Sequence, residues 1–190
     1  MKTAKGYIEV NNIKENIVHV SFSKNEERNY SSFIIEDEVL EIIKSGNEDS
    51  FIAAEVDERT SAVTFTNKKT GELILREKKK TLVETPVYKY TTGDEEPIVD
   101  RVKTVDGERN FIKNLRQEVD RIAYRGKIEF SFSPDEGIYG LGQGEDGIYK
   151  LRNHSQYLYQ HNMRIPMLFF YSDKGYGILF DGACLMTWED

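Results

Sequence analysis

The sequence predicts an all-β protein, built as an antiparallel β-sandwich, from three observations. Apolar and polar residues alternate with a period of two at 18–23, 63–66 and 128–133, as they do in strands with one buried face. Turn-forming residues separate these stretches, and candidate helices are scarce. Many short strands joined by turns are typical of a sandwich. We expect a single domain over residues 1–190, a length sufficient for a sizeable core.

The turns and apolar runs predict how the strands are arranged. The stretch NKKTG has Asn67 at its start and Gly71 where a positive φ is needed, which predicts a hairpin. The run PMLFFYS at 166–172 is continuously apolar, which predicts a strand covered on both faces. In chain order, strands are expected at 18–23, 51–56, 63–66, 73–76, 85–90, 128–133, 166–172 and 176–181.

The remaining segments predict a helix candidate, loops and a basic edge. The segment IIEDEVLEIIKSG at 34–46 fits a helix or a pair of strands. GNEDS at 46–50 and the acidic TTGDEEP at 91–97 predict loops. The three lysines at 78–80 predict a solvated strand edge or hairpin, because edge lysines discourage pairing with another sheet.

Composition excludes several classes of function. The chain has 190 residues, of which 38% are hydrophobic and 31% charged, which predicts a soluble globular protein. Its 33 acidic and 26 basic residues give a net charge of -7, which argues against a nucleic-acid partner. No stretch approaches the roughly 18 apolar residues of a membrane span. The N-terminus has no apolar signal region, so we expect a cytoplasmic protein.

Few residue groups suggest catalysis or metal binding. The only cysteine, Cys184, lies in the apolar stretch GACLMTW, which predicts a buried and inert thiol. His154 and His161 could meet across a loop but have no third ligand, so no metal is expected. The carboxylate pairs at 135–136, 145–146 and 189–190 are adjacent in sequence, so an extended backbone points each pair to opposite faces. Turn and surface roles are expected for them, rather than paired glycosidase chemistry.

The string GQGEDG at 142–147 matches the G-x-G-x-x-G pattern of dinucleotide-binding folds. That pattern requires a helix directly after it and backbone N–H groups free to bind a phosphate. Here a Tyr-, Asn- and His-rich stretch without helical periodicity follows, and Glu145 and Asp146 would repel a phosphate. We therefore expect no nucleotide cofactor, nor any other cofactor.

The loop at 149–162 has a composition that suits a sugar. Tyr149, Tyr157 and Tyr159 lie among planar polar side chains. A sugar has apolar C–H faces and a rim of hydroxyls, which match flat rings beside hydrogen-bonding groups. The candidate substrate-contacting residues of this loop are Arg152, Asn153, His154 and Gln160.

Motifs in a fixed order occupy the last third of the chain. IYGLGQ at 138–143 and LYQHN at 158–162 precede IPMLFFYSDKGYGILFD at 165–181. In this order they resemble the N-terminal domain of glycoside hydrolase family 31, which includes α-glucosidases and α-xylosidases. The resemblance implies a galactose-mutarotase-like sandwich followed by a catalytic (β/α)8 barrel. It also implies that glycines 140, 142 and 144 serve a sharp turn and close backbone packing, not phosphate binding.

The resemblance further implies a function for the chain. It would be the N-terminal domain of a retaining α-glycosidase acting on α-linked glucosyl or xylosyl saccharides, by hydrolysis or transfer. The family's nucleophile motif, similar to Asp-Met-Asn-Glu, does not occur here, and a barrel needs about 250 residues of its own. The chain alone is therefore expected to be inactive, to pack on its own barrel, and to lend the loop at 149–162 to the sugar pocket.

Two alternatives stay open at this stage. One is a non-catalytic carbohydrate-binding sandwich, and the other is a purely structural interaction domain. The sequence leaves the sugar, the linkage and homo-oligomer formation undecided.

Overall fold

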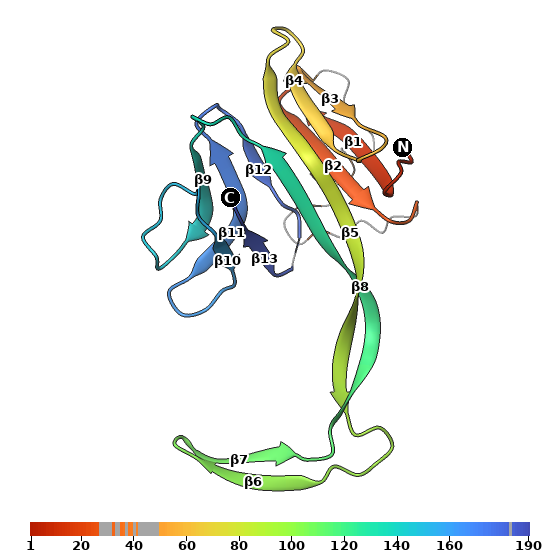
Figure 1. Ribbon diagram of the computed structural model, residues 1–190, viewed down its shortest axis with the longest axis vertical. Coiled ribbons are helices and arrows are strands. Elements are labelled where there is room, and N and C mark those ends of the chain that lie inside the picture. Colours follow the sequence, from red (N-terminus) through yellow and green to blue (C-terminus); the bar gives the residue numbers. More distant parts are fainter. Residues whose placement is uncertain (27–31, 33–34, 37, 40, 42–49, 183) are drawn as a thin grey trace. The chain divides into compact units, whose positions relative to one another are not determined.

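The computed structural model describes residues 1–26, 32, 35–36, 38–39, 41, 50–182 and 184–190. Within these residues it contains thirteen β-strands (Figure 1), and the strand pairs with a defined register are antiparallel. The predicted all-β antiparallel fold is confirmed. The helix candidate at 34–46 and the loop at 46–50 fall mainly outside the described residues, although Glu38, Val39 and Glu41 have helical backbone.

Two strands are much longer than the rest. They are β5 (Leu73–Thr91) and β8 (Arg116–Ser131), which run side by side (Figure 1) in a sheet of order β3-β4-β5-β8. The other strands are β1 (Tyr7–Lys14), β2 (Ile17–Ser23), β3 (Ile52–Val56), β4 (Val63–Asn67), β6 (Val99–Thr104), β7 (Gly107–Ile112), β9 (Ile138–Gln143), β10 (Gln156–Leu158), β11 (Ile165–Ser172), β12 (Gly177–Leu179) and β13 (Met186–Trp188). Each predicted strand overlaps one of these. The remaining sheets are β1-β2, β6-β7, β12-β11-β9 and β10-β13.

The predicted hairpin between β4 and β5 is confirmed. The side-chain oxygen of Asn67 accepts a hydrogen bond from the N–H of Lys69 at 2.9 Å. Gly71 has a φ of 73°, in the left-handed region that glycine adopts without strain.

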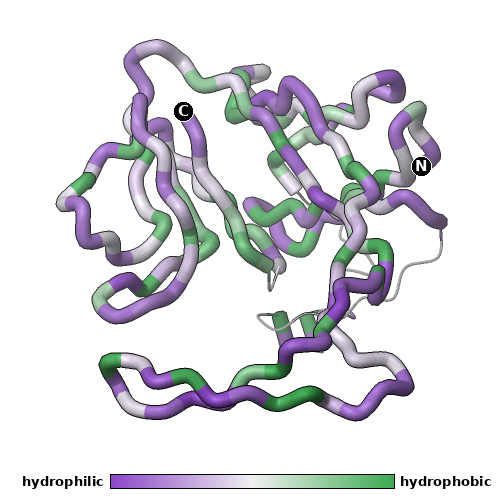
Figure 2. The backbone as a smooth tube through the Cα atoms, turned by 60° about the horizontal axis from the view of Figure 1, so that its bottom comes forward, coloured by the Kyte–Doolittle hydropathy of each residue, from purple (hydrophilic) through white to green (hydrophobic). Residues whose placement is uncertain are grey.

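The chain divides into two compact units, one formed by residues 1–80 and 128–190 and the other by residues 81–127. In the second unit, all of whose residues are described, no hydrophobic side chain is buried. Hydrophobic and hydrophilic segments alternate along its β6–β7 hairpin (Figure 2). The acidic segment predicted to be a loop at 91–97 lies in this unit and is a loop from residue 92 onward, after β5 ends at Thr91. A single domain over residues 1–190 stays a prediction.

The core of the first unit lies where the end of β8 meets the sheet β12-β11-β9. Phe170 of β11 is fully buried. Its ring lies edge-on to those of Phe130 in β8 and Phe132 just after β8, with centroids 6.0 Å and 6.1 Å apart. The indole of Trp188 on β13 lies 5.1 Å from the same ring. Inward-facing aromatic rings from two sheets thus fill the space between them, as a sandwich requires.

The apolar run at 166–172 is not covered on both faces, contrary to prediction. It forms β11, but Met167 is 57% exposed and Tyr171 44% exposed. Only the face that carries Phe170 packs on β8, so the opposite face stays open. Cys184 is also exposed rather than buried. It precedes β13, whose partly buried apolar residues packed against the core are Met186 and Trp188.

The edge position predicted for the three lysines at 78–80 is wrong, because β5 lies between β4 and β8 in its sheet. Lys78 and Lys79 are exposed, whereas Lys80 is only 3% exposed. Its ammonium lies 2.9 Å from a carboxylate oxygen of Glu77 and 5.7 Å from the ring centroid of Phe22. Burial of a lysine requires such pairing.

The backbone of β9 is irregular, and this explains two of its glycines. Gly140 and Gly142 have φ values of 117° and 84°, and the buried Leu141 between them has a φ of 61°. A Cβ on Gly140 would lie 2.7 Å from the carbonyl oxygen of Phe169, and one on Gly142 would collide with the carbonyl of Ile165. Close approach of β9 to β11 therefore requires both glycines. The glycine at 144 has no such constraint, since the nearest atom would be 3.7 Å away.

Candidate functional site

The candidate site is built by the loop at 144–164, which connects β9 to β11. Within it, the short strand β10 pairs with β13, placing Gln156 opposite Trp188 and Tyr157 opposite Thr187. Because alternate strand residues face opposite sides, the next residue of β10, Leu158, is buried. The chain thus fixes the direction of each side chain in the middle of a long loop.

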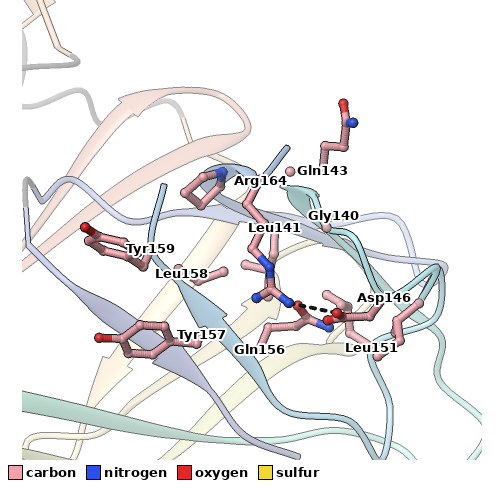
Figure 3. Close-up of a pocket in the computed structure, with 14 residues that line it drawn as sticks. Gly140, Leu141, Gln143, Asp146, Leu151, Gln156, Tyr157, Leu158, Tyr159 and Arg164 are labelled. Atoms are coloured by element: carbon pink, nitrogen blue, oxygen red, sulfur yellow. Dashed lines mark hydrogen bonds and ion pairs between the residues drawn. The ribbon is translucent and has the colours of Figure 1, made fainter. Parts of the chain in front are cut away.

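Two adjoining hollows lie along this loop, and Figure 3 shows the residues that line the smaller one. The smaller has a volume of about 20 Å³, enough for about one water molecule. The larger is more open, with about 300 Å³, which reaches the lower end of the range for ligand pockets. The two share Asp146, Gln156, Tyr157 and Arg164.

Arg164 ties the end of this loop to its beginning. Its Nε lies 3.3 Å from a carboxylate oxygen of Glu145, and its Nη2 lies 2.7 Å from one of Asp146. Figure 3 shows this guanidinium directed at Asp146 across the hollow. The acidic part of GQGEDG is therefore engaged by an arginine, and in the described residues after it no helix begins.

Arg152, the first of the predicted sugar-contacting residues, is engaged within the chain. Its Nε donates to the side chain of Asp190 at 2.7 Å. Its Nη1 donates to the backbone carbonyls of Ser133 and Glu136 at 2.9 Å and 3.0 Å. The guanidinium also lies 5.6 Å from the ring centroid of Phe132. Only 18% of this side chain is exposed, so Arg152 anchors the loop to the sandwich.

Asp190 receives a second hydrogen bond from the same part of the loop. The N–H of Asn153 donates to its Oδ2 at 2.7 Å. Burial tends to raise the pKa of Asp190, but this backbone N–H and the Arg152 guanidinium outweigh burial, so the pKa is lowered. The carboxylate thus stays charged and holds the loop at two points.

The other predicted residues are exposed on the loop. Asn153 has a left-handed backbone with a φ of 62°. The N–H of His154 donates to the carbonyl of Leu151 at 3.2 Å. The side chains of Asn153, His154 and Gln160 are all exposed. The structure brings Arg152 and Asn153 together at Asp190. None of the four predicted residues is among those that line the two hollows. Sugar contact by these four residues stays a prediction.

The sequence reasoning missed two residues that line both hollows, Asp146 and Arg164. Eighteen positions separate them, so neither stands out as a pair in the sequence. The signal that could have found them is charge, because Arg164 is the lone basic residue in the second half of a loop that begins with two carboxylates.

A buried carboxylate lies in the turn before β9 and is not among the residues that line the two hollows. Glu136 is 4% exposed, contrary to the surface role predicted for it. Its Oε1 accepts hydrogen bonds from the hydroxyls of Ser172 and Tyr176 at 2.6 Å and 2.5 Å, and its Oε2 accepts one from the N–H of Ser133 at 2.9 Å. Burial, followed by the hydrogen bond to Glu136, raises the pKa of the Tyr176 hydroxyl. The network joins the turn before β9 to the end of β11.

Among the described side chains, no group of three or more His, Cys, Asp or Glu residues is arranged to hold a metal ion. In the same residues, no helix has the length and hydropathy needed to cross a membrane.

Comparison with known proteins places the fold. No family model matches the chain. Over 82 residues the chain is 37% identical to an alpha-xylosidase of Saccharolobus solfataricus, a match that covers 38% of this chain and 11% of that protein. The crystal structure of a GH31 alpha-xylosidase from Xanthomonas citri matches 97% of this chain and 18% of its own, with a TM-score of 0.59 and 16% identity.

The chain carries a family 31-like domain. The resemblance seen in the motifs at 138–181 is thereby confirmed. At 16% identity the solved structure shows the fold of the family 31-like domain and no more. The chain spans about a tenth of the length of the curated relative and less than a fifth of the solved one.

Proposed function

We propose that the chain is the N-terminal domain of a retaining α-glycosidase that acts on α-linked glucosyl or xylosyl saccharides by hydrolysis or transfer. The observation that carries this proposal is the 37% identity over 82 residues to an alpha-xylosidase. The order of the motifs at 138–143, 158–162 and 165–181 also supports it. The chain would pack on a catalytic barrel.

The state of the carboxylates supports a catalytic site outside this chain. A retaining glycosidase needs two free carboxyl groups about 5–5.5 Å apart. Of the three adjacent pairs in the sequence, five members are engaged in the structure. Lys174 pairs with Asp135, Ser172 and Tyr176 bind Glu136, Arg164 pairs with Glu145 and Asp146, and Arg152 pairs with Asp190. Groups held in this way are poor candidates for a nucleophile and an acid.

The loop at 149–162 would contribute to the sugar pocket of the complete enzyme. Its exposed polar side chains, Asn153, His154 and Gln160, are available to hydrogen-bond hydroxyls. Arg152 would hold the loop in position through its hydrogen bonds to Asp190 and to the carbonyls of Ser133 and Glu136. The alternative is that the loop only packs on the barrel.

Two proteins test the main proposal, namely this chain alone and a longer protein that continues into the downstream coding sequence. Both would be assayed with p-nitrophenyl α-glucoside and α-xyloside, and the anomer of the first product would be determined by NMR. We expect turnover with retention from the longer protein and none from the chain. Activity that copurifies with the chain alone, or a longer protein without paired aspartates and without turnover, would contradict the proposal.

Two variants of the longer protein test the role of the loop. Asn153→Ala and His154→Ala should each lower kcat/KM by about tenfold to hundredfold, as expected for a lost substrate hydrogen bond. Unfolding should be unchanged in His154→Ala, whereas Asn153→Ala should lower the free energy of unfolding by about 1 kcal/mol, because alanine disfavours the left-handed backbone of this position, where φ is 62°. Lys69→Ala, on the distant β4–β5 turn, is the matched control. Full activity in both loop variants would make the loop a scaffold only.

A carbohydrate-binding sandwich without catalysis is the second candidate. It is favoured by the exposure of Tyr157 and Tyr159, which are 51% and 53% exposed. The two candidates differ in the downstream sequence, because only the first requires a barrel with two catalytic aspartates.

A further inference from the structure

An exposed row of aromatic rings runs along the loop at every second residue. The ring centroids of Tyr157 and Tyr159 are 6.1 Å apart, with their planes at 33°. Those of Tyr159 and His161 are also 6.1 Å apart, with their planes at 38°. Figure 3 shows the two tyrosine rings side by side and turned away from the ion pair of Arg164. We call Tyr157, Tyr159 and His161 the aromatic row.

Backbone contacts hold the aromatic row in place. Tyr157 lies in β10, opposite Thr187 of β13. The N–H of Tyr159 donates to the carbonyl of Tyr157 at 3.0 Å, and the N–H of Arg164 donates to the carbonyl of His161 at 2.7 Å. All three side chains are exposed. Single exposed aromatic residues need no explanation, but rings gathered in one patch mark a binding surface.

The larger hollow gives this row a polar border. It is lined by Tyr157 together with hydrogen-bonding groups that include Ser155, Gln156 and Thr187. Its charged groups are Arg164 and the carboxylates of residues 146 and 189, so negative charge is in excess. An anionic ligand is therefore disfavoured, and a neutral ligand with many hydroxyls is favoured. Single-stranded nucleic acid also stacks on aromatic rows, but it requires a positive groove.

We propose that the aromatic row binds an oligosaccharide of two or more sugar rings. The apolar faces of successive sugars would lie on successive aromatic rings, and their hydroxyls would meet the polar border of the hollow. That the ligand is a saccharide rests on the proposed function. That it has two or more sugar rings rests on the three rings of the aromatic row. Oligosaccharides, rather than small alkyl or aryl glycosides, would then be the substrate class that this domain selects.

The chain contains its own reporter for this binding. Trp188 is its single tryptophan and lines the larger hollow. The chain would be titrated with maltotriose and with methyl α-glucoside, following Trp188 fluorescence and ligand NMR line widths. We expect maltotriose to bind at least about tenfold more tightly than methyl α-glucoside, since it covers more than one ring of the row.

Tyrosine variants identify the surface. Tyr157→Ala and Tyr159→Ala should each weaken maltotriose binding by about threefold to tenfold, which corresponds to one lost aromatic contact. The phenylalanine variants should bind nearly as the parent does, because they keep the ring. Tyr90→Ala is the matched control, since this tyrosine is 68% exposed in the second unit. Circular dichroism would verify that each variant is folded.

Three results would overturn the inference. They are equal affinity for the two saccharides, no maltotriose binding at tens of millimolar, and an unchanged affinity in the Tyr157→Ala/Tyr159→Ala double variant. Binding of a dT oligonucleotide in place of maltotriose would also overturn it.

The longer protein separates this inference from the proposed function. Turnover of p-nitrophenyl α-glycosides with maltotriose kinetics unchanged by the double variant would leave the proposed function standing and remove the aromatic row. Maltotriose binding that depends on the aromatic row, in a longer protein without turnover, would support the aromatic row and contradict the proposed function.

Discussion

Replacing Arg152 by alanine tests whether this residue binds sugar or holds its loop in place. The sequence made it a candidate for sugar contact. In the structure its hydrogen bonds are directed to Asp190 and to the carbonyls of Ser133 and Glu136, and its guanidinium lies near the ring of Phe132. We therefore expect Arg152→Ala to act chiefly on stability.

The expected loss follows from the contacts. Removing the guanidinium leaves the carbonyl of the buried Glu136 without this donor, at a cost of about 1–2 kcal/mol. The ion pair with Asp190, partly open to solvent, adds about 1 kcal/mol. The contact with Phe132 adds about 0.5 kcal/mol. The free energy of unfolding should fall by about 3 kcal/mol. Arg152→Lys, which keeps the charge and loses the planar fork, should lose about half of this.

Urea unfolding followed by Trp188 fluorescence would measure this change. With a slope of about 1–3 kcal/mol per molar urea, the midpoint should fall by about 1–3 M. Arg121→Ala, which removes an exposed ion pair with Asp120, is the control and should leave the midpoint nearly unchanged. An unaltered midpoint in Arg152→Ala, combined with lost maltotriose affinity, would refute the anchoring role and assign Arg152 to the ligand.

Three further predictions concern the fold around the site. The pKa of Asp190 is lowered in the folded state, so the ionised carboxylate stabilises the fold above the unfolded pKa of about 3.9, and this stabilisation is lost as pH falls through the folded pKa. Asp190→Asn should therefore reduce the free energy of unfolding at pH 7 and make that free energy depend less on pH in the acid range. Gly142→Ala should lower the thermal midpoint far more than Gly147→Ala, because both have positive φ but only the first Cβ would meet backbone; equal midpoints would contradict the packing role. Phe170→Ala should cost about 3–5 kcal/mol in urea unfolding, as for other buried phenylalanines, and a loss below 1 kcal/mol would place the core elsewhere.

The strands were predictable because their signals are local. Alternation at 18–23 and 63–66 follows from the geometry of the pleated strand, and the turn at Asn67 to Gly71 follows from the backbone conformation that glycine allows. The order of motifs at 138–181 is likewise a property of the sequence, and it indicates the family without the tertiary structure. The composition of the loop at 149–162 also indicated which segment to consider for a sugar.

The errors concern which strands neighbour each other. Lys80 is buried where its side chain meets Phe22 of β2, and one face of β11 is open because only its other face meets β8. The residues of a strand do not by themselves show which other elements cover its faces. A continuous apolar run reports hydrophobicity, whereas coverage depends on elements from elsewhere in the chain.

The sequence by itself determined the fold class and the loop that carries the candidate site. Only the tertiary structure decided the role of each side chain in that loop. The anchoring of Arg152 depends on Asp190, 38 positions away, and the hollow depends on the pairing of β10 with β13. Contacts of this kind are fixed when distant segments pack, because a charged or aromatic side chain acts through whichever groups the fold brings within a few ångströms of it.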